Sequence, residues 1–303
     1  MTKRHVSLPD DAEATLRGFV SAVDDRLAAA SDPDELADAV TETLVDLHGA
    51  RDAYESWQND DAASPVEAAR FANFDPRNAT LESEYYAEKD EGAFARSKPL
   101  QWLWRQFDNT PLADNVAFAL RFRRMLAGHL FADVGEGVRL FKGISMTYGH
   151  NIELGDNVVV HDDVHLDDRG ELVIGDRASV SDAAHVYTHD HDLVDQTEVT
   201  NFRTEIGADA RVTQGALVRA GVRVGENAVV GSRAVVQADV PDHHVAVGMP
   251  AKSVRVKPGW ESVADPVEAD HERRQDERRL DSEMPEDLDA FDEFQRDLTP
   301  PDA

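Results

Sequence analysis

Two histidines within a short acidic run are the side chains of this sequence best suited to proton chemistry. The run reads Thr188-His189-Asp190-His191-Asp192, and Asp195 follows it. An imidazole takes up a proton near neutral pH, so it suits the task of a general base that activates a hydroxyl group. Asp190, Asp192 or Asp195 could hold the ring of His189 in the required tautomer. Residue type alone fits a solvated loop histidine at least as well, so the surrounding elements must decide.

The composition narrows the chemistry further. None of the 303 residues is cysteine, which excludes a disulfide scaffold, a cysteine zinc site and a cysteine nucleophile. The longest stretch without Lys, Arg, Asp or Glu is residues 143–152, too short to cross a bilayer as a helix. Residues 1–10 carry no apolar signal segment. We therefore expect a cytoplasmic protein.

The chain carries a formal charge of −29, from 31 basic and 60 acidic residues. This excess is spread out, because residues 1–133, 134–258 and 261–303 carry net charges of −11, −7 and −11. Such a surface repels nucleic acid and anionic membranes. Only six of the 31 basic residues are lysine. An acidic, lysine-poor surface resembles that of proteins from salt-in halophiles, whose molar internal salt screens the self-repulsion.

Residues 1–131 are predicted to form a helical N-terminal region. Apolar residues recur at helical spacing over 16–27 and 36–47, and a break near 74–79 precedes two further helices at roughly 80–107 and 113–131. We interpret the aromatic residues of the last two helices as core packing. This region holds no catalytic constellation.

From residue 134 onward the pattern changes, and an aliphatic residue returns every six positions. A period of six fits the two-residue alternation of strands but not the 3.6-residue turn of a helix. Three such hexapeptides make one triangular coil, so we predict a parallel β-helix over residues 132–258. The inward positions would be Val134, Leu140, Met146, Leu154, Val160, Leu166, Ile174, Val180, Val186, Ile206, Val212, Val218, Val224, Val230 and Val236.

The acidic run lies in an interruption of this repeat, between Val186 and Ile206. A solenoid tolerates such a loop without losing its core, and insertions of this kind commonly serve a binding face. After residue 258 comes an acidic tail, 259–303, in which charges alternate over 265–281 as in a helix. The tail is thus predicted to be partly helical.

Three segments resemble the hexapeptide-repeat, left-handed β-helix acyltransferases, and most closely the sugar and cell-surface-glycan O-acetyltransferases related to maltose and galactoside acetyltransferases. One is the repeat itself. Another is Thr188-His189-Asp190-His191-Asp192, which is similar to the family's segment with the catalytic histidine, and the third is Gly248-Met249-Pro250-Ala251-Lys252, similar to the turn that closes the acyl-CoA groove. The resemblance covers about 120–257.

The resemblance implies that His189 is the catalytic base for transfer of an acetyl group from acetyl-CoA to a hydroxyl of a sugar or glycan. His191 is the alternative base or binds the acceptor, and Asp192 is a supporting residue. Many family members carry an asparagine one coil before the histidine. Asp162 is the nearest match here, and because it is an acid, it is expected to bind acceptor hydroxyls.

The resemblance also implies a coenzyme groove along the coils after the interruption. Small residues would let the pantetheine approach the backbone, and basic residues would meet the phosphates; these residues are Gln214, Gly215, Ala216, Gly231, Ser232, Lys252 and Arg255, with Lys257 nearby. In this family the groove lies between the subunits of a trimer. A homotrimer without a metal is therefore expected.

Two alternatives stay open. Histidines 161, 165, 185 and 189 would suit a zinc site resembling that of γ-class carbonic anhydrases, although His185 precedes an inward position and is expected at the surface. The other alternative is a trimeric scaffold that binds a partner through its helical region and has no activity.

Overall fold

The structure is a computed structural model that describes residues 7–59, 63–194, 198–267 and 275–282. These residues form two compact units. The first comprises residues up to Glu84 together with Asp90–Leu130, and the second comprises Tyr85–Lys89 and the chain from Phe131 onward. Each unit is described by itself.

The first unit is helical. Its core contains stacked rings of Phe107 and Phe122, 4.2 Å apart, and a buried ion pair of 2.6 Å between Arg123 and Asp108. The helices are α1 (Asp10–Ala29), α2 (Pro33–Leu47), α3 (Arg51–Gln58), α4 (Pro65–Ala72), α5 (Glu91–Asp108) and α6 (Val116–Leu130), with 3₁₀ turns η1 (Pro76–Asn78), η2 (Glu82–Tyr85) and η3 (Pro111–Asp114).

The structure contains a helix in each of the four predicted segments. One of these helices is shorter than predicted, and two further helices were not predicted. The predicted helix at 80–107 begins only at Glu91, where the Asp90 side chain accepts a hydrogen bond from the Ala93 backbone as an N-cap. Helices α3 and α4 were not predicted, because each spans only eight residues, too few for a repeated helical pattern to stand out.

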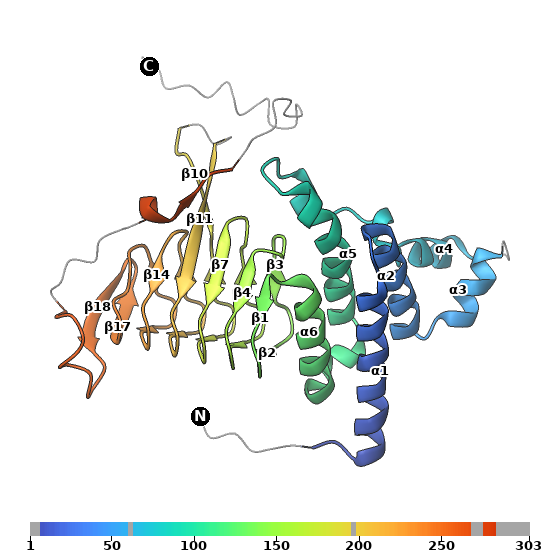
Figure 1. Cartoon of the computed structure of the whole chain (residues 1–303), viewed down its shortest axis with the longest axis horizontal. Helices are drawn as coiled ribbons and strands as arrows, with labels where there is room; N and C mark the ends of the chain where they lie inside the picture. The colour runs from blue at the N-terminus through green and yellow to red at the C-terminus, as the bar shows by residue number, and fades with distance from the viewer. Residues whose placement is uncertain (1–6, 60–62, 195–197, 268–274, 283–303) are drawn as a thin grey trace. The chain divides into compact units, whose positions relative to one another are not determined.

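The second unit contains the predicted parallel β-helix (Figure 1). Three sheets run along it, one strand from each sheet per coil. The first sheet contains β1 (Asp133–Val134), β4 (Ile152–Leu154), β7 (Glu171–Ile174), β11 (Val199–Ile206) and β14 (Arg223–Val224); the second contains β2 (Arg139–Leu140), β5 (Val159–Val160), β8 (Ser179–Val180), β12 (Arg211–Val212), β15 (Val229–Val230), β17 (His244–Gly248) and β18 (Ala251–Val256); the third contains β3 (Ser145–Met146), β6 (His165–Leu166), β9 (His185–Val186), β13 (Leu217–Val218) and β16 (Val235–Val236).

The strand register shows coils of two lengths, and the shorter one is that of three hexapeptides. Asp133 pairs with Glu153, 20 positions on, whereas Glu205 pairs with Arg223, 18 positions on. All the predicted inward residues except Val134 are buried; Val134, in the first coil, is half-buried. The six-residue period therefore reports side chains that point into the coil axis.

The interruption of the repeat forms a hairpin. Strand β10 (His189–His191) pairs antiparallel with the start of β11, and the end of β11 returns to the first sheet beside β7. The pairing of Arg203 with Glu171 shows the extra length, because these partners are 32 positions apart. Figure 1 shows this hairpin extending from the stack of coils.

The described part of the tail contradicts the helix predicted at 265–281. Residues 275–280 form a 3₁₀ turn, η4 (Gln275–Arg278), and a short strand, β19 (Arg279–Leu280), which pairs antiparallel with β11. Unpaired backbone groups at the edge of β11 form hydrogen bonds with β19. This pairing stabilises a strand here more than the alternating charges would stabilise a helix. Residues 268–274 and 283–303 lie outside the described residues.

Candidate active site

The hairpin leaves the β-helix at the corner between the third and first sheets. Three consecutive coils contribute segments to this corner: residues 147–151, 167–170 and 187–191. We call them together the hairpin corner. The sequence-predicted base, His189, lies here at the first position of β10.

His189 contacts a buried carboxylate at the hairpin corner. Its Nδ1 atom lies 2.7 Å from Oδ2 of Asp167, and the two side chains are 18% and 1% exposed. Asp167 also accepts hydrogen bonds from the backbone N–H and the hydroxyl of Thr188, at 2.8 and 3.1 Å, and from the hydroxyl of Thr147 at 2.8 Å. The carboxylate is therefore fixed from several directions.

These contacts determine the tautomer of His189. Burial alone would raise the pKa of Asp167, but the hydrogen bonds from His189, Thr188 and Thr147 hold that pKa well below its ordinary value. An ionised carboxylate can only accept hydrogen bonds, so Nδ1 of His189 carries the proton. In the neutral ring Nε2 then has a free lone pair, as a general base requires.

The neighbouring Asp168 shapes the backbone of the corner. Its carboxylate accepts hydrogen bonds from the backbone N–H groups of Thr147, Tyr148 and Asn151, at 3.0, 2.7 and 3.2 Å. Burial raises the pKa of Asp168 to about 7, with a further contribution from the charge of Asp167, while the N–H donors oppose the rise. Asp168 thus holds residues 147–151 in place beside Asp167.

The acids expected to orient His189 lie elsewhere. Asp190 forms an ion pair with Arg219, and Asp192 accepts a hydrogen bond of 2.7 Å from the backbone of Val194. Asp195 lies outside the described residues. The sequence signal for Asp167 was its position: it follows the inward Leu166 at the same corner, one coil before His189.

His191 is the other sequence-predicted residue that lies beside His189. Their ring centroids are 5.3 Å apart, as expected for alternate positions of one strand, and His191 is exposed. Tyr187 lies between His189 and His185, with ring centroids 6.2 Å from each, and His185 is exposed, as predicted. The corner thus carries a row of aromatic rings.

The structure places Asp162 away from this row. It lies at the corner between the second and third sheets, where its Oδ1 accepts a hydrogen bond of 3.1 Å from the backbone of Lys142. Asp156 makes the same kind of contact, at 2.7 Å, with the backbone of Glu136. Asp162 is therefore engaged in a turn contact that recurs along the β-helix.

A segment from between η2 and α5 completes the hairpin corner. Glu88 forms a buried ion pair with Arg169, and the guanidinium carbon of Arg169 lies 4.0 Å from the ring centroid of Tyr86. The sequence does not reveal this segment, Tyr85–Lys89, because its five residues show no periodicity and lie far from Arg169 along the chain.

Comparison with known proteins identifies the family. No protein-family model matches the chain. The putative colanic acid biosynthesis acetyltransferase WcaF of Escherichia coli (strain K12) is 30% identical over 154 residues, which are 50% of this chain and 85% of that protein. The chain belongs to the hexapeptide-repeat acetyltransferase family. It is therefore an acyltransferase, and its catalytic fold is the one that the repeat predicted.

Two solved structures share the fold of this acetyltransferase. A maltose O-acetyltransferase from Clostridium difficile 630 has a TM-score of 0.50 and 26% identity over 59% of this chain and 98% of that one. A galactoside acetyltransferase in complex with coenzyme A has a TM-score of 0.52 and 22% identity, over 61% of this chain and 94% of that one. Both structures show the same fold. The maltose enzyme, together with the galactoside O-acetyltransferase of Escherichia coli (strain K12), which is 28% identical over 44% of this chain and 68% of that protein, places this acetyltransferase close to the galactoside and maltose enzymes, as the motifs predicted.

The residues predicted to bind the coenzyme lie at a different corner of the acetyltransferase. Gln214, Gly215 and Ala216 in one coil, and Gly231 and Ser232 in the next, connect the second sheet to the third. Within one chain, the third sheet separates them from the hairpin corner. Their two coils adjoin, because the backbone N–H of Arg233 donates to the carbonyl of Gln214 at 3.0 Å.

Gly215 is not required by its backbone conformation. Its φ is +65°, but the same corner of neighbouring coils holds Asp163, Ala183 and Arg233 at φ between 55° and 58°. An added Cβ at Gly215 would meet only the Cγ of Arg233, at 3.4 Å. The absence of a side chain leaves the corner open, as a closely approaching ligand needs.

The basic residues predicted for the coenzyme phosphates lie on or beside β18. Lys252 and Arg255 are exposed, whereas Lys257 donates a hydrogen bond to Asn227. Within the described ranges, no three His, Asp or Glu side chains are arranged to hold a metal ion. Nor is any helix in those ranges both long and apolar enough to cross a membrane.

Proposed function

We propose that this acetyltransferase transfers an acetyl group from acetyl-CoA to a hydroxyl group of a sugar or glycan, with His189 as the general base. The proposal depends on one observation: His189, on the hairpin, is hydrogen-bonded to Asp167, in the preceding coil of the β-helix. The galactoside acetyltransferase of the same fold, solved with coenzyme A, supports the choice of donor.

The proposed reaction needs one base and no covalent enzyme intermediate. Nε2 of His189 takes the proton of the acceptor hydroxyl as its oxygen attacks the thioester carbonyl carbon, and a C–O bond forms. The tetrahedral intermediate collapses as the C–S bond breaks. The leaving thiolate of coenzyme A takes the proton from the imidazolium, which restores the neutral histidine.

Asp167 is a positioning residue in this scheme. Its ionised carboxylate fixes the Nδ1–H tautomer of His189 and stabilises the imidazolium that forms during attack. Because Asp167 is buried and held by three other hydrogen bonds, the ring loses little orientation between turnovers.

The active site would lie between subunits of a homotrimer. The proposed coenzyme residues, from Gln214 to Arg255, and His189 lie on opposite sides of the third sheet in one chain. Packing against a second copy would bring one chain's coenzyme corner to the other chain's hairpin corner. Lys252 and Arg255 would then meet the phosphates of the coenzyme.

The acceptor is proposed from chemistry and relatives together. The row of His185, Tyr187, His189 and His191 offers ring faces and ring nitrogens, which suit a ligand with both C–H faces and hydroxyl groups. WcaF, named for colanic acid biosynthesis, and the galactoside and maltose enzymes act within this chemical class by their names.

The test is acetyl transfer from labelled acetyl-CoA, in high salt, to a panel of sugars, oligosaccharides, amines and serine. We expect acetylated sugar products, and His189→Ala should lower kcat by about 10²- to 10⁴-fold. His191→Ala is the comparison variant: if it, and not His189→Ala, abolishes turnover, the base is His191. Absence of transfer to every acceptor by the parent protein would contradict the proposed function.

A further inference from the structure

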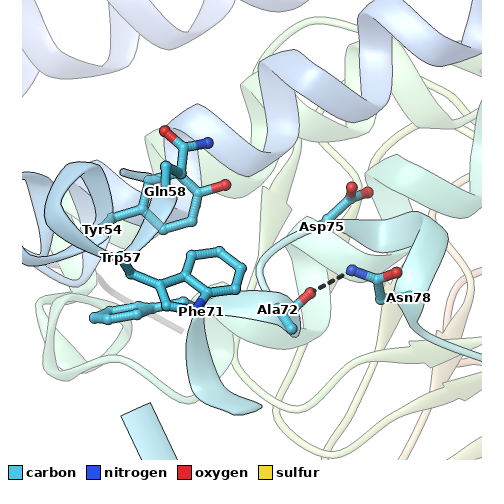
Figure 2. A pocket seen from close by; sticks show the side chains of 7 residues that line it. All are labelled: Tyr54, Trp57, Gln58, Phe71, Ala72, Asp75 and Asn78. Carbon is cyan, nitrogen blue, oxygen red and sulfur yellow. Dashed lines mark hydrogen bonds between the residues drawn. The ribbon is translucent and has the colours of Figure 1, made fainter. Parts of the chain in front are cut away.

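The helical unit contains a hollow whose lining includes none of the residues proposed for acetyl transfer. It holds about 460 Å³, within the range of roughly 300–1,000 Å³ that is typical of sites for small molecules. We call it the aromatic hollow; its lining residues are Tyr54, Trp57, Gln58, Phe71, Ala72, Asp75 and Asn78. Figure 2 shows the rings on one side and Asp75 and Asn78 on the other.

One wall of the aromatic hollow is a fixed group of rings from α3 and α4. Tyr54 and Phe71 meet edge to face at 5.9 Å and are only 6% and 5% exposed. Trp57 packs on both, with centroid distances of 5.6 and 5.8 Å, and is half-buried. The indole therefore has a set position while part of it remains open to a ligand.

The opposite edge of the hollow carries polar groups that are also held in place. Asp75 accepts hydrogen bonds of 2.9 and 2.8 Å from the backbone and side-chain Nε of Arg77, and Nδ2 of Asn78 donates to the carbonyl of Ala72 at 2.8 Å. No hydrogen bond to another described residue involves the Oδ1 of Asn78 or the exposed amide of Gln58, which lies on the ring side beside Tyr54 (Figure 2). They remain able to accept or donate.

Trp57 carries a further hydrogen-bond donor, its indole N–H, on the aromatic wall (Figure 2). Among the described residues no hydrogen bond from this Nε1–H is found, whereas Trp102 of the same unit donates from Nε1 to the carbonyl of Asn73 at 3.0 Å. A half-buried indole usually satisfies this group, and a ligand hydroxyl would do so here.

This arrangement selects a class of ligand. The lining contains no lysine or arginine, so an anion is not favoured, and its one carboxylate, Asp75, already contacts Arg77, which also pairs with Asp34 and Asp38. A ring with an apolar C–H face and a hydroxyl edge matches the aromatic wall and the polar edge at once. We propose that the aromatic hollow binds one residue of a neutral glycan.

Binding here is independent of acetyl transfer, but it has a consequence if the proposed function holds. A polymeric acceptor that binds in the aromatic hollow and is long enough to reach the transfer site would be present there at a raised effective concentration. Long acceptors would then have a lower KM than short ones.

The test measures binding to the full chain in high salt by saturation-transfer NMR and calorimetry, without acetyl-CoA. The probes are neutral tetrasaccharides of glucose or galactose. We expect Gln58→Ala and Trp57→Phe each to weaken binding about three- to tenfold, since each removes one hydrogen-bonding group. Asn59→Ala, which alters the adjacent exposed amide outside the lining, should leave the Kd unchanged within about twofold.

Unfolding curves would confirm that the variants fold, because Trp57→Phe keeps an aromatic ring on the wall. The inference is overturned if no neutral tetrasaccharide binds the parent at millimolar concentration, or if both lining variants bind as the parent does. It is also overturned if adenosine 3′,5′-bisphosphate, the nucleotide end of coenzyme A, binds and displaces the sugar, since the hollow would then be a nucleotide site. None of these outcomes depends on whether the protein transfers acetyl groups.

Discussion

Nδ1 of His189 lies 2.7 Å from Oδ2 of Asp167, a carboxylate that belongs to the preceding coil and is 22 residues earlier in the chain. The contact joins the inserted hairpin to the regular β-helix. The insertion supplies the proposed base, His189, and the repeat supplies the carboxylate that contacts it, so this contact needs both parts of the sequence.

Asp167→Asn should lower kcat/KM at least about tenfold, because an amide can present its N–H to Nδ1 and stabilise the wrong tautomer of His189. The measurement is acetyl transfer in high salt. Asp156→Asn is the control, since Asp156 also accepts a backbone hydrogen bond at a corner but lies away from His189. Equal loss of activity in both variants would assign the effect to folding.

The same substitution has a pH signature. The pKa of Asp167 is lowered in the folded protein, so its stabilising contribution is complete above the ordinary carboxyl pKa of about 3.9 and is lost as the pH falls below it. The free energy of unfolding of the parent should therefore exceed that of Asp167→Asn at pH 6, and the gap should narrow by pH 3. Urea unfolding at both pH values checks this; a constant gap would contradict it.

The six-residue period was sufficient to predict the coils, because every inward position must be aliphatic and every strand is short. It could not identify Asp167 as the partner of His189. Acids close to His189 in sequence, such as Asp190 and Asp192, were the natural choice, but β10 turns Asp190 towards Arg219. Contacts between coils depend on coil length and corner geometry, which the period alone does not contain.

Short elements escaped prediction for a related reason. Strand β19 has two residues and no period, and its position is determined by the edge of β11 that it covers. The Tyr85–Lys89 segment is likewise held by partners distant in the chain, among them Arg169, which pairs with Glu88 and lies over the ring of Tyr86. Long-range partners of this kind are not visible in a local pattern.

The docked tail leads to a prediction about the hairpin. The guanidinium of Arg278, in the tail, donates hydrogen bonds to the carboxylate of Asp239 at 2.7 Å and to the carbonyl of Gly221 at 2.8 Å. Buried atoms of Asn201 in β11 and Gln275 in η4 have no hydrogen-bond partner among the described residues. Because the contacts of Arg278 are those that join the tail to the β-helix by an ion pair, Arg278→Ala should release β19.

We expect this release to speed hydrogen exchange at residues 201–202 of β11 and to lower kcat about two- to tenfold, because the hairpin holding His189 loses its third strand. Mass spectrometry of exchanged peptides measures the first effect. Arg279→Ala is the matched control: it is the neighbouring residue, exposed, and pairs with Phe202 through its backbone. Unchanged exchange in Arg278→Ala would show that the ion pair does not hold the tail.

Gly215→Ala tests the proposed coenzyme corner. The variant should fold, because Ala183 adopts the same backbone conformation at this corner in another coil, at a cost of about 1–2 kcal/mol for the left-handed region. If the pantetheine lies against Gly215, the added methyl should raise KM for acetyl-CoA about five- to tenfold. Ala183→Gly is the reciprocal control, and an unchanged KM in Gly215→Ala would remove this residue from the groove.

The charge of −29 predicts how stability depends on salt. The excess of acids is spread along the whole chain, so self-repulsion opposes both the compact fold and any assembly of identical subunits. At 0.1 M salt the screening length is about 10 Å and neighbouring surface charges still interact, whereas at 1 M it is about 3 Å and most of the repulsion is screened.

We therefore expect the midpoint of thermal unfolding to rise steeply between 0.1 and 2 M KCl. We also expect subunit association, measured by light scattering, to fail below molar salt. Sucrose at equal osmotic strength separates screening from general exclusion effects, because it leaves the charges unscreened. Full stability and full activity in dilute buffer would contradict the halophilic interpretation of the acidic surface.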